Sequence, residues 1–157
     1  MEQIKELEAS LKRQHKSVKE FAEEYYSMAD DCIAMAKDYH AGIANLNKAI
    51  RLNSTFTAAY LKRGIFSVEL ADYEDAERDF TKVISLDKQS ADGYTERAAV
   101  RMLLNKNAAA KQDLISATKL SPNDGRAYYL LGKVLTKLGD VEEADKFFNI
   151  AASLGFK

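Results

Sequence analysis

The stretch that decides the fold is GRAYYLLGKVLTKLGDVEEADKFFNIAASLG, which runs from Gly125 to Gly155. Its apolar residues follow helical spacing in two separate runs, and Leu138, Gly139 and Asp140 lie between them. A single amphipathic helix has no need of small residues at Gly132 and Ala144, whereas two closely packed helices do. The stretch therefore predicts a pair of helices joined by a turn at residues 138–140.

The same pattern recurs along the chain with a period of 34 residues. Tyrosine, bulky apolar, small and leucine positions all repeat in one register, without an insertion. The repeating sets are Tyr26, Tyr60, Tyr94 and Tyr128; Leu46, Phe80, Leu114 and Phe148; Ala49, Val83, Ala117 and Ala151; and Leu52, Leu86, Leu120 and Leu154. A fixed period of this length is the signature of a repeat architecture.

In these features the chain resembles the tetratricopeptide repeat (TPR) family, whose unit is a 34-residue pair of antiparallel helices. The resemblance implies an all-α fold, a right-handed α-solenoid of four helix-turn-helix hairpins, in which Gly64, Ala98 and Gly132 allow close helix approach. Asp30, Arg63 and Arg97 depart from the family pattern, and we expect them to soften the packing locally. The expected units are 23–56, 57–90, 91–124 and 125–157, and together they form a TPR domain over residues 23–157.

Residues 1–22 precede the repeat and predict a helical extension, because they contain neither Gly nor Pro. Apolar residues are spaced three and four apart, with Gln14 as an interruption, and one helix is expected from near Glu2 to about Lys37. The extension either packs along the first hairpin as a cap or forms a heptad seam that pairs two chains. The seam residues would be Ile4, Leu7, Leu11, Val18 and Phe21.

Composition excludes several other classes of function. The formal net charge is -1 and there is no run of Lys and Arg, so nucleic acid is not expected as a partner. No apolar stretch approaches the roughly 20 residues that a membrane span needs. A single cysteine, Cys32, and the absence of a leader-like apolar segment at the start indicate a cytoplasmic location.

The sequence also predicts no catalytic chemistry. His15 and His40, the only histidines, are far apart in the chain, and metal sites or general bases usually need clustered partners. Adjacent carboxylates such as Glu142 and Glu143 point in different directions on a helix. With no phosphate-binding loop or nucleophile motif, we expect neither an enzyme nor a cofactor nor a metal site.

The resemblance implies that partners bind in a concave groove lined by the first helix of each unit. The groove positions are acidic in the first unit, apolar in the middle two and basic in the last. The residues expected to contact a partner are Leu61, Ile65, Val68, Ala99, Met102, Arg126, Tyr129, Lys133 and Lys137. Alternatively, the apolar members are covered by the N-terminal helix or curl inward.

One subclass of the family grips chaperone tails through a carboxylate clamp of Lys, Asn and Arg residues. The matching positions of units one to three hold Ser27, Asp31, Lys62, Asp92 and Glu96, so acids stand where cations are needed. We therefore expect a non-catalytic adaptor, scaffold or chaperone-like holder that binds a peptide segment without this clamp. The alternative is a self-assembly module that forms homo-oligomers through the N-terminal helix or an open C-terminal hairpin.

Overall fold

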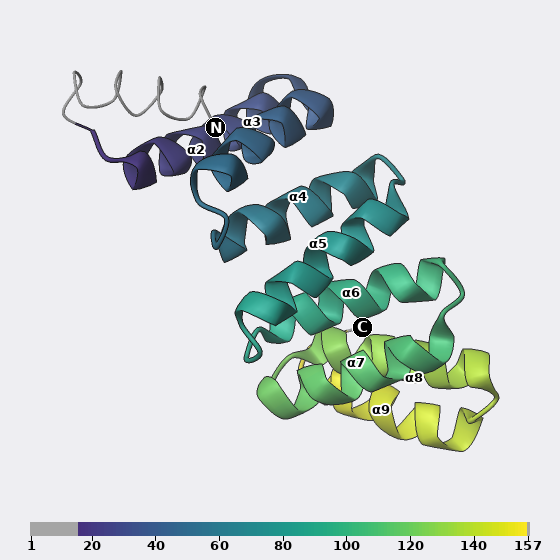
Figure 1. The fold of residues 1–157 in the computed structure, drawn as a ribbon. Coiled ribbons are helices and arrows are strands. Elements are labelled where there is room, and N and C mark those ends of the chain that lie inside the picture. The colour runs from purple at the N-terminus through teal and green to yellow at the C-terminus, as the bar shows by residue number, and fades with distance from the viewer. Residues whose placement is uncertain (1–15, 157) are drawn as a thin grey trace.

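The computed structural model describes residues 16–156, and Figure 1 shows this part of the chain as a stack of helical hairpins. Eight α-helices and no strands occur within it. They are α2 (Val18–Ala36), α3 (Tyr39–Leu52), α4 (Thr57–Glu69), α5 (Tyr73–Leu86), α6 (Ala91–Leu103), α7 (Asn107–Leu120), α8 (Gly125–Leu138) and α9 (Val141–Ser153). The predicted all-α solenoid of helix-turn-helix hairpins is confirmed.

The helices repeat in the register that the sequence predicts. The first helices of units two, three and four begin at Thr57, Ala91 and Gly125, which are 34 residues apart. In addition to their hairpin partners, α4 packs on α6 and α6 packs on α8. Second helices of successive units pack on one another less extensively over residues 16–156. The first helices therefore line the inner, concave side of the stack.

The turn inside each hairpin depends on one left-handed residue. This residue is Lys37, Ala71, Asn105 and Gly139 in the four units, with φ angles of 50°, 61°, 59° and 91°. A side chain makes this conformation unfavourable, and glycine removes the penalty. Only the fourth unit uses glycine here, so the repeat imposes the same turn on less suitable residues in the other three.

Close helix packing within a hairpin depends on a small residue that faces a large one. A Cβ atom placed on Gly64 would lie 2.6 Å from the Phe80 ring, and one on Gly132 would lie 2.6 Å from the Phe148 ring. In unit three, Leu114 takes the position of these phenylalanines and is smaller than they are. Ala98 is fully buried and belongs to the same core cluster as Leu114. The predicted role of these small residues is confirmed.

Arg63 and Arg97, expected to soften the packing, instead form buried ion pairs. The Arg63 guanidinium donates to both carboxylate oxygens of Asp79 at 2.8 and 2.6 Å. Arg97 repeats this geometry with Asp113 at 2.9 and 2.7 Å. Both aspartates are almost completely buried. The arginines and aspartates are each 34 residues apart, so this is one structural feature used twice.

The predicted continuous helix from near Glu2 to Lys37 is wrong. The backbone of Ser17 is extended, and α2 begins only at Val18. Ser17 and Glu20 form a capping box, in which each side chain accepts a hydrogen bond from the other residue's backbone N–H. Val18 and Phe21 are half-buried on α2, whereas Ile4, Leu7 and Leu11 lie outside the described residues.

Candidate functional site

The concave side carries a strip of apolar side chains on α4 and α6. Ile65 is 39% exposed and Leu103 is 53% exposed, so both leave apolar surface in contact with water. Leu61, Val68 and Ala99 are half-buried beside them. Leu61 and Val68 also pack against the cluster of Ala76, Phe80 and Val100, so they curl partly inward. We call Leu61, Ile65, Val68, Ala99 and Leu103 the apolar strip.

Met102 does not belong to this surface. It is 6% exposed and packs in the core cluster that contains Leu114 and Leu131. The prediction that Met102 offers contact area in the groove is therefore wrong, and the next residue, Leu103, is exposed instead. The repeat register contains a signal, because two of the three positions equivalent to Leu103 are charged, namely Glu69 and Lys137, and the third is Met35.

The basic end of the groove consists of two lysines on α8. Lys133 and Lys137 are both exposed. The Lys133 ammonium lies 5.7 Å from the centre of the Tyr129 ring, which itself packs against Phe148 and Phe156. The Lys137 ammonium lies 3.4 Å from the Met102 carbonyl oxygen on α6. The first contact holds Lys133 against Tyr129 on the same helix, and the second holds Lys137 next to α6, where Leu103 of the apolar strip lies.

Arg126, the third predicted cation, is already paired. Its guanidinium donates to both carboxylate oxygens of Glu96, one of them at 3.1 Å. The hydrogen bonds that Arg126 donates to Glu96 raise the pKa of Arg126 and outweigh the opposite effect of burial. Arg126 therefore links α8 to α6, and the basic end is reduced to the two lysines.

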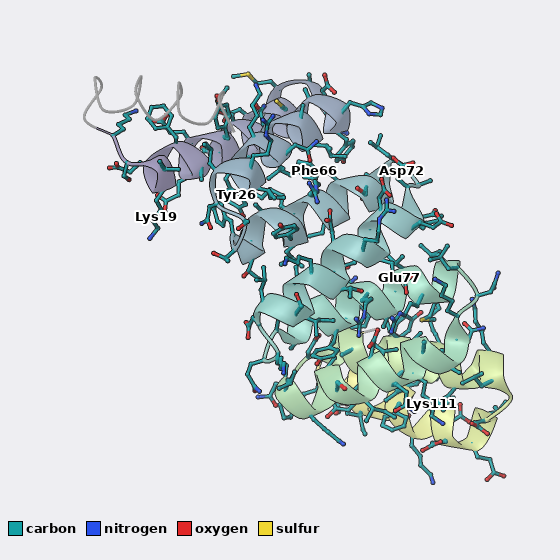
Figure 2. The ribbon with its side chains drawn as sticks, in the orientation of Figure 1. Lys19, Tyr26, Phe66, Asp72, Glu77 and Lys111 are labelled. Carbon is teal, nitrogen blue, oxygen red and sulfur yellow. The ribbon has the colours of Figure 1, made fainter. Side chains whose placement is uncertain are left out.

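The acidic end lies on α2. Asp31 is exposed there. Both carboxylate oxygens of the neighbouring Asp30 accept a hydrogen bond from the Lys62 ammonium, each at 2.6 Å. The Lys62 ammonium also lies 3.5 Å from the centre of the Tyr26 ring. Tyr26 belongs to α2 and is labelled in Figure 2. Lys62 is thus held between α2 and α4. The residues predicted to line the groove therefore include exposed acid on α2, apolar side chains on α4 and α6, and exposed lysines on α8.

Residues 16–156 contain no group of three or more His, Cys, Asp or Glu side chains placed to hold a metal ion. His40 is exposed on α3, away from the first helices that line the groove. None of the helices in this range combines the length and apolar character that crossing a bilayer requires. The groove is consequently the feature on which the functional argument rests.

Stacked hairpins with a continuous inner surface define a helical-repeat protein of the α-solenoid class. Comparison with known proteins agrees with this class. The tetratricopeptide repeat family model matches residues 57–90 and 125–154. Rat serine/threonine-protein phosphatase 5 is 38% identical over 103 residues, which are 66% of this chain and 20% of the phosphatase. Zebrafish tetratricopeptide repeat protein 36 is 36% identical over 97 residues, or 59% of this chain and 52% of that protein.

Solved structures share the fold at lower identity. A crystal structure of MamA matches with a TM-score of 0.80 and 21% identity over 94% of this chain and 84% of MamA. The first TPR domain of Spaghetti (RPAP3), bound to the HSP90 peptide SRMEEVD, matches with a TM-score of 0.74 and 22% identity, covering 77% and 95%. The family model thus identifies tetratricopeptide repeats in residues 57–90 and 125–154, and the solved structures show the same fold. It spans about a fifth of the length of the phosphatases it matches.

Proposed function

We propose that this protein binds a peptide segment of a partner protein in its concave groove and acts as an adaptor, scaffold or chaperone-like holder. The observation that carries the proposal is the exposure of Ile65 and Leu103 on adjacent first helices. Exposed apolar side chains that are rimmed by charge mark interaction sites. The TPR relatives, which are interaction modules, support the same class of function.

The chemistry of the groove defines the segment that fits it. Apolar anchors on the segment would cover Ile65 and Leu103 and remove their surface from water. Acidic residues at one end of the segment would meet Lys133 and Lys137, where charge-assisted hydrogen bonds can form. A basic residue at the other end would approach Asp31. Binding of this kind would set both the composition of the segment and its direction along the groove.

The proposed binding mode differs from that of the structural relative bound to an HSP90 peptide. A carboxylate clamp needs free cations, yet Lys62 is paired with Asp30, and Glu96 is paired with Arg126. Asp31 and Asp92 add negative charge at two further clamp positions. We predict that the peptide SRMEEVD does not bind this chain measurably in calorimetry at concentrations that saturate the RPAP3 domain. Tight binding of SRMEEVD would contradict the clamp-free mode.

A matched pair of variants tests the groove. Ile65→Asp with Leu103→Asp adds two charges to the apolar strip, and Ser85→Asp with Gln112→Asp adds two charges to exposed positions on α5 and α7. We expect only the first pair to abolish partner capture while both pairs keep wild-type circular dichroism. Equal capture by the two pairs, with both folded, would contradict binding in the groove.

A specific observation also favours self-assembly as a second candidate function. Ile150 on α9 is 39% exposed and Leu154, the C-cap residue of α9, is 38% exposed on the same side of the helix. Two chains could cover these residues by pairing their α9 faces. Sedimentation equilibrium over a concentration series would then show a mass that rises towards the dimer, and Ile150→Asp would abolish the rise. A concentration-independent monomer mass would exclude this candidate.

A further inference from the structure

A second hollow lies outside the groove, between the first and second units. It has a volume of about 500 Å³ and opens among α3, the end of α4 and the start of α5. Its walls include Ile43, Ser67, Asp72 and the buried Asp79. Figure 2 labels Asp72, which lies at the turn between α4 and α5. The apolar strip is not part of this hollow.

The repeat provides an internal reference for what this space can hold. Between units two and three, the position equivalent to Ser67 is Arg101, and the position equivalent to Asp79 is Asp113. The Arg101 side chain donates to Asp113 at 2.8 Å and to Glu77 at 2.7 Å. A guanidinium therefore occupies the corresponding space one unit further along. Ser67 is too short to do the same between units one and two.

The two buried aspartates differ in the hydrogen bonds they accept. Asp113 accepts three, two from Arg97 and one from Arg101. Asp79 accepts only the two from Arg63 among the side-chain hydrogen bonds of the described residues. A carboxylate has about four lone-pair positions, so the Asp79 carboxylate has spare acceptor capacity. The third donor that the repeat supplies internally to Asp113 is missing for Asp79.

The charges around the hollow favour a cation. Its three carboxylates are Asp72, Asp75 and Asp79, its two guanidiniums are Arg63 and Arg78, and the imidazole of His40 also lines it. Both guanidiniums are already engaged, Arg63 with Asp79 and Arg78 with Asp75. Asp72 has no ion-pair partner among residues 16–156. An anion in the hollow would be repelled by the unpaired Asp72 carboxylate, whereas a cation could form an ion pair with it.

We propose that this hollow binds an arginine side chain presented by a partner protein, with the guanidinium in the place that Arg101 takes in the next interface. The planar guanidinium would donate to Asp79 inside the hollow and to Asp72 at its mouth. The alkyl part of the side chain would lie against Ile43, which replaces the charged Glu77 of the next interface. The site is independent of the groove.

Nuclear magnetic resonance titration with N-acetyl-arginine methylamide tests the proposal on the full chain. We expect shifts of the Ser67 and Asp72 backbone amides, and no such shifts with the neutral isostere N-acetyl-citrulline methylamide. Asp72→Asn should weaken the response several-fold. Equal shifts with both compounds, or shifts located elsewhere, would overturn the proposal. Tighter binding of free arginine than of the blocked compound would overturn the assignment to a protein side chain.

Filling the hollow from within gives a second test. Ser67→Arg copies Arg101, so we expect the new side chain to bind Asp79, raise the melting temperature and abolish the response to the arginine compound. The proposal fails if Ser67→Arg folds and still responds to the arginine compound.

Discussion

Units three and four solve one packing problem in two different ways. In unit three, Arg97 on α6 meets Asp113 on α7 as a buried ion pair, while unit four has Leu131 and Phe147 at the same positions. The helices of both units follow the same 34-residue register. The difference shows that the hairpin tolerates either chemistry at these two positions, and unit one has a third combination there, Ala29 with Asn45.

The largest loss of stability is expected from removing one partner of the ion pair and leaving the other. Asp113→Ala leaves Arg97 buried without its partner and removes one of the two carboxylates that Arg101 binds, which should lower the free energy of unfolding by about 3–5 kcal/mol. Urea denaturation measures this loss. Replacing both residues as in unit four, Arg97→Leu with Asp113→Phe, should recover most of it. A double variant as unstable as Asp113→Ala would show that the two chemistries are not interchangeable.

The close contact in unit four gives the next largest effect. Gly132→Leu forces a side chain against the Phe148 ring and should cost on the order of 2 kcal/mol by overpacking. Thermal unfolding checks this, with Lys133→Leu on the exposed neighbouring position as the control. An unchanged melting temperature for Gly132→Leu would mean that α8 and α9 are less closely packed than described.

Substitutions in the hairpin turns of units three and four are expected to change stability by a smaller amount. Gly139→Ala places a Cβ atom in the left-handed region of the turn and should cost about 1 kcal/mol. Asn105→Gly, at the equivalent turn of unit three, should change stability less, because asparagine tolerates this conformation. Urea unfolding of both variants measures the difference. Equal losses would show that the left-handed turn is not what distinguishes these residues.

The smallest effect concerns pH and the charges that join unit two to unit three. Burial raises the pKa of Glu77, but hydrogen bonds from Lys106 and Arg101 outweigh it, so the pKa lies below its usual value. A lowered folded-state pKa means that Glu77 stabilises the fold above its unfolded pKa of about 4.3 and that this contribution is lost as pH falls through the folded-state value. Glu77→Gln should therefore flatten the acid side of the stability profile measured by urea unfolding. An identical profile in the variant would contradict this role.

The sequence was sufficient to predict the fold because its repeat is visible in single residue types. Tyrosines, small residues and leucines recur at one spacing, and the packing of Gly132 against Phe148 follows from it. The break before α2 was missed, because the capping box at Ser17 is a local interaction inside an otherwise helical pattern. Apolar spacing alone does not report such an interaction.

The site was predicted less completely than the fold. Hydropathy cannot separate Met102, which faces the core, from Leu103, which faces outward, since both are apolar and adjacent. The pairing of Arg126 with Glu96 joins residues 30 positions apart, and a single sequence does not show it. For the same reason, the aspartate partners of Arg63 and Arg97 emerged only from the structure.

Site-specific photocrosslinking tests the central claim of partner binding in the groove most directly. A photoreactive phenylalanine would replace Ile65 or Leu103 in the groove, or Ser85 or Gln112 on the second helices, in proteins exposed to the same partner mixture. We predict one shared crosslinked species at positions 65 and 103 and none at positions 85 and 112. Crosslinks confined to positions 85 and 112 would contradict the account and place the binding surface on the convex side.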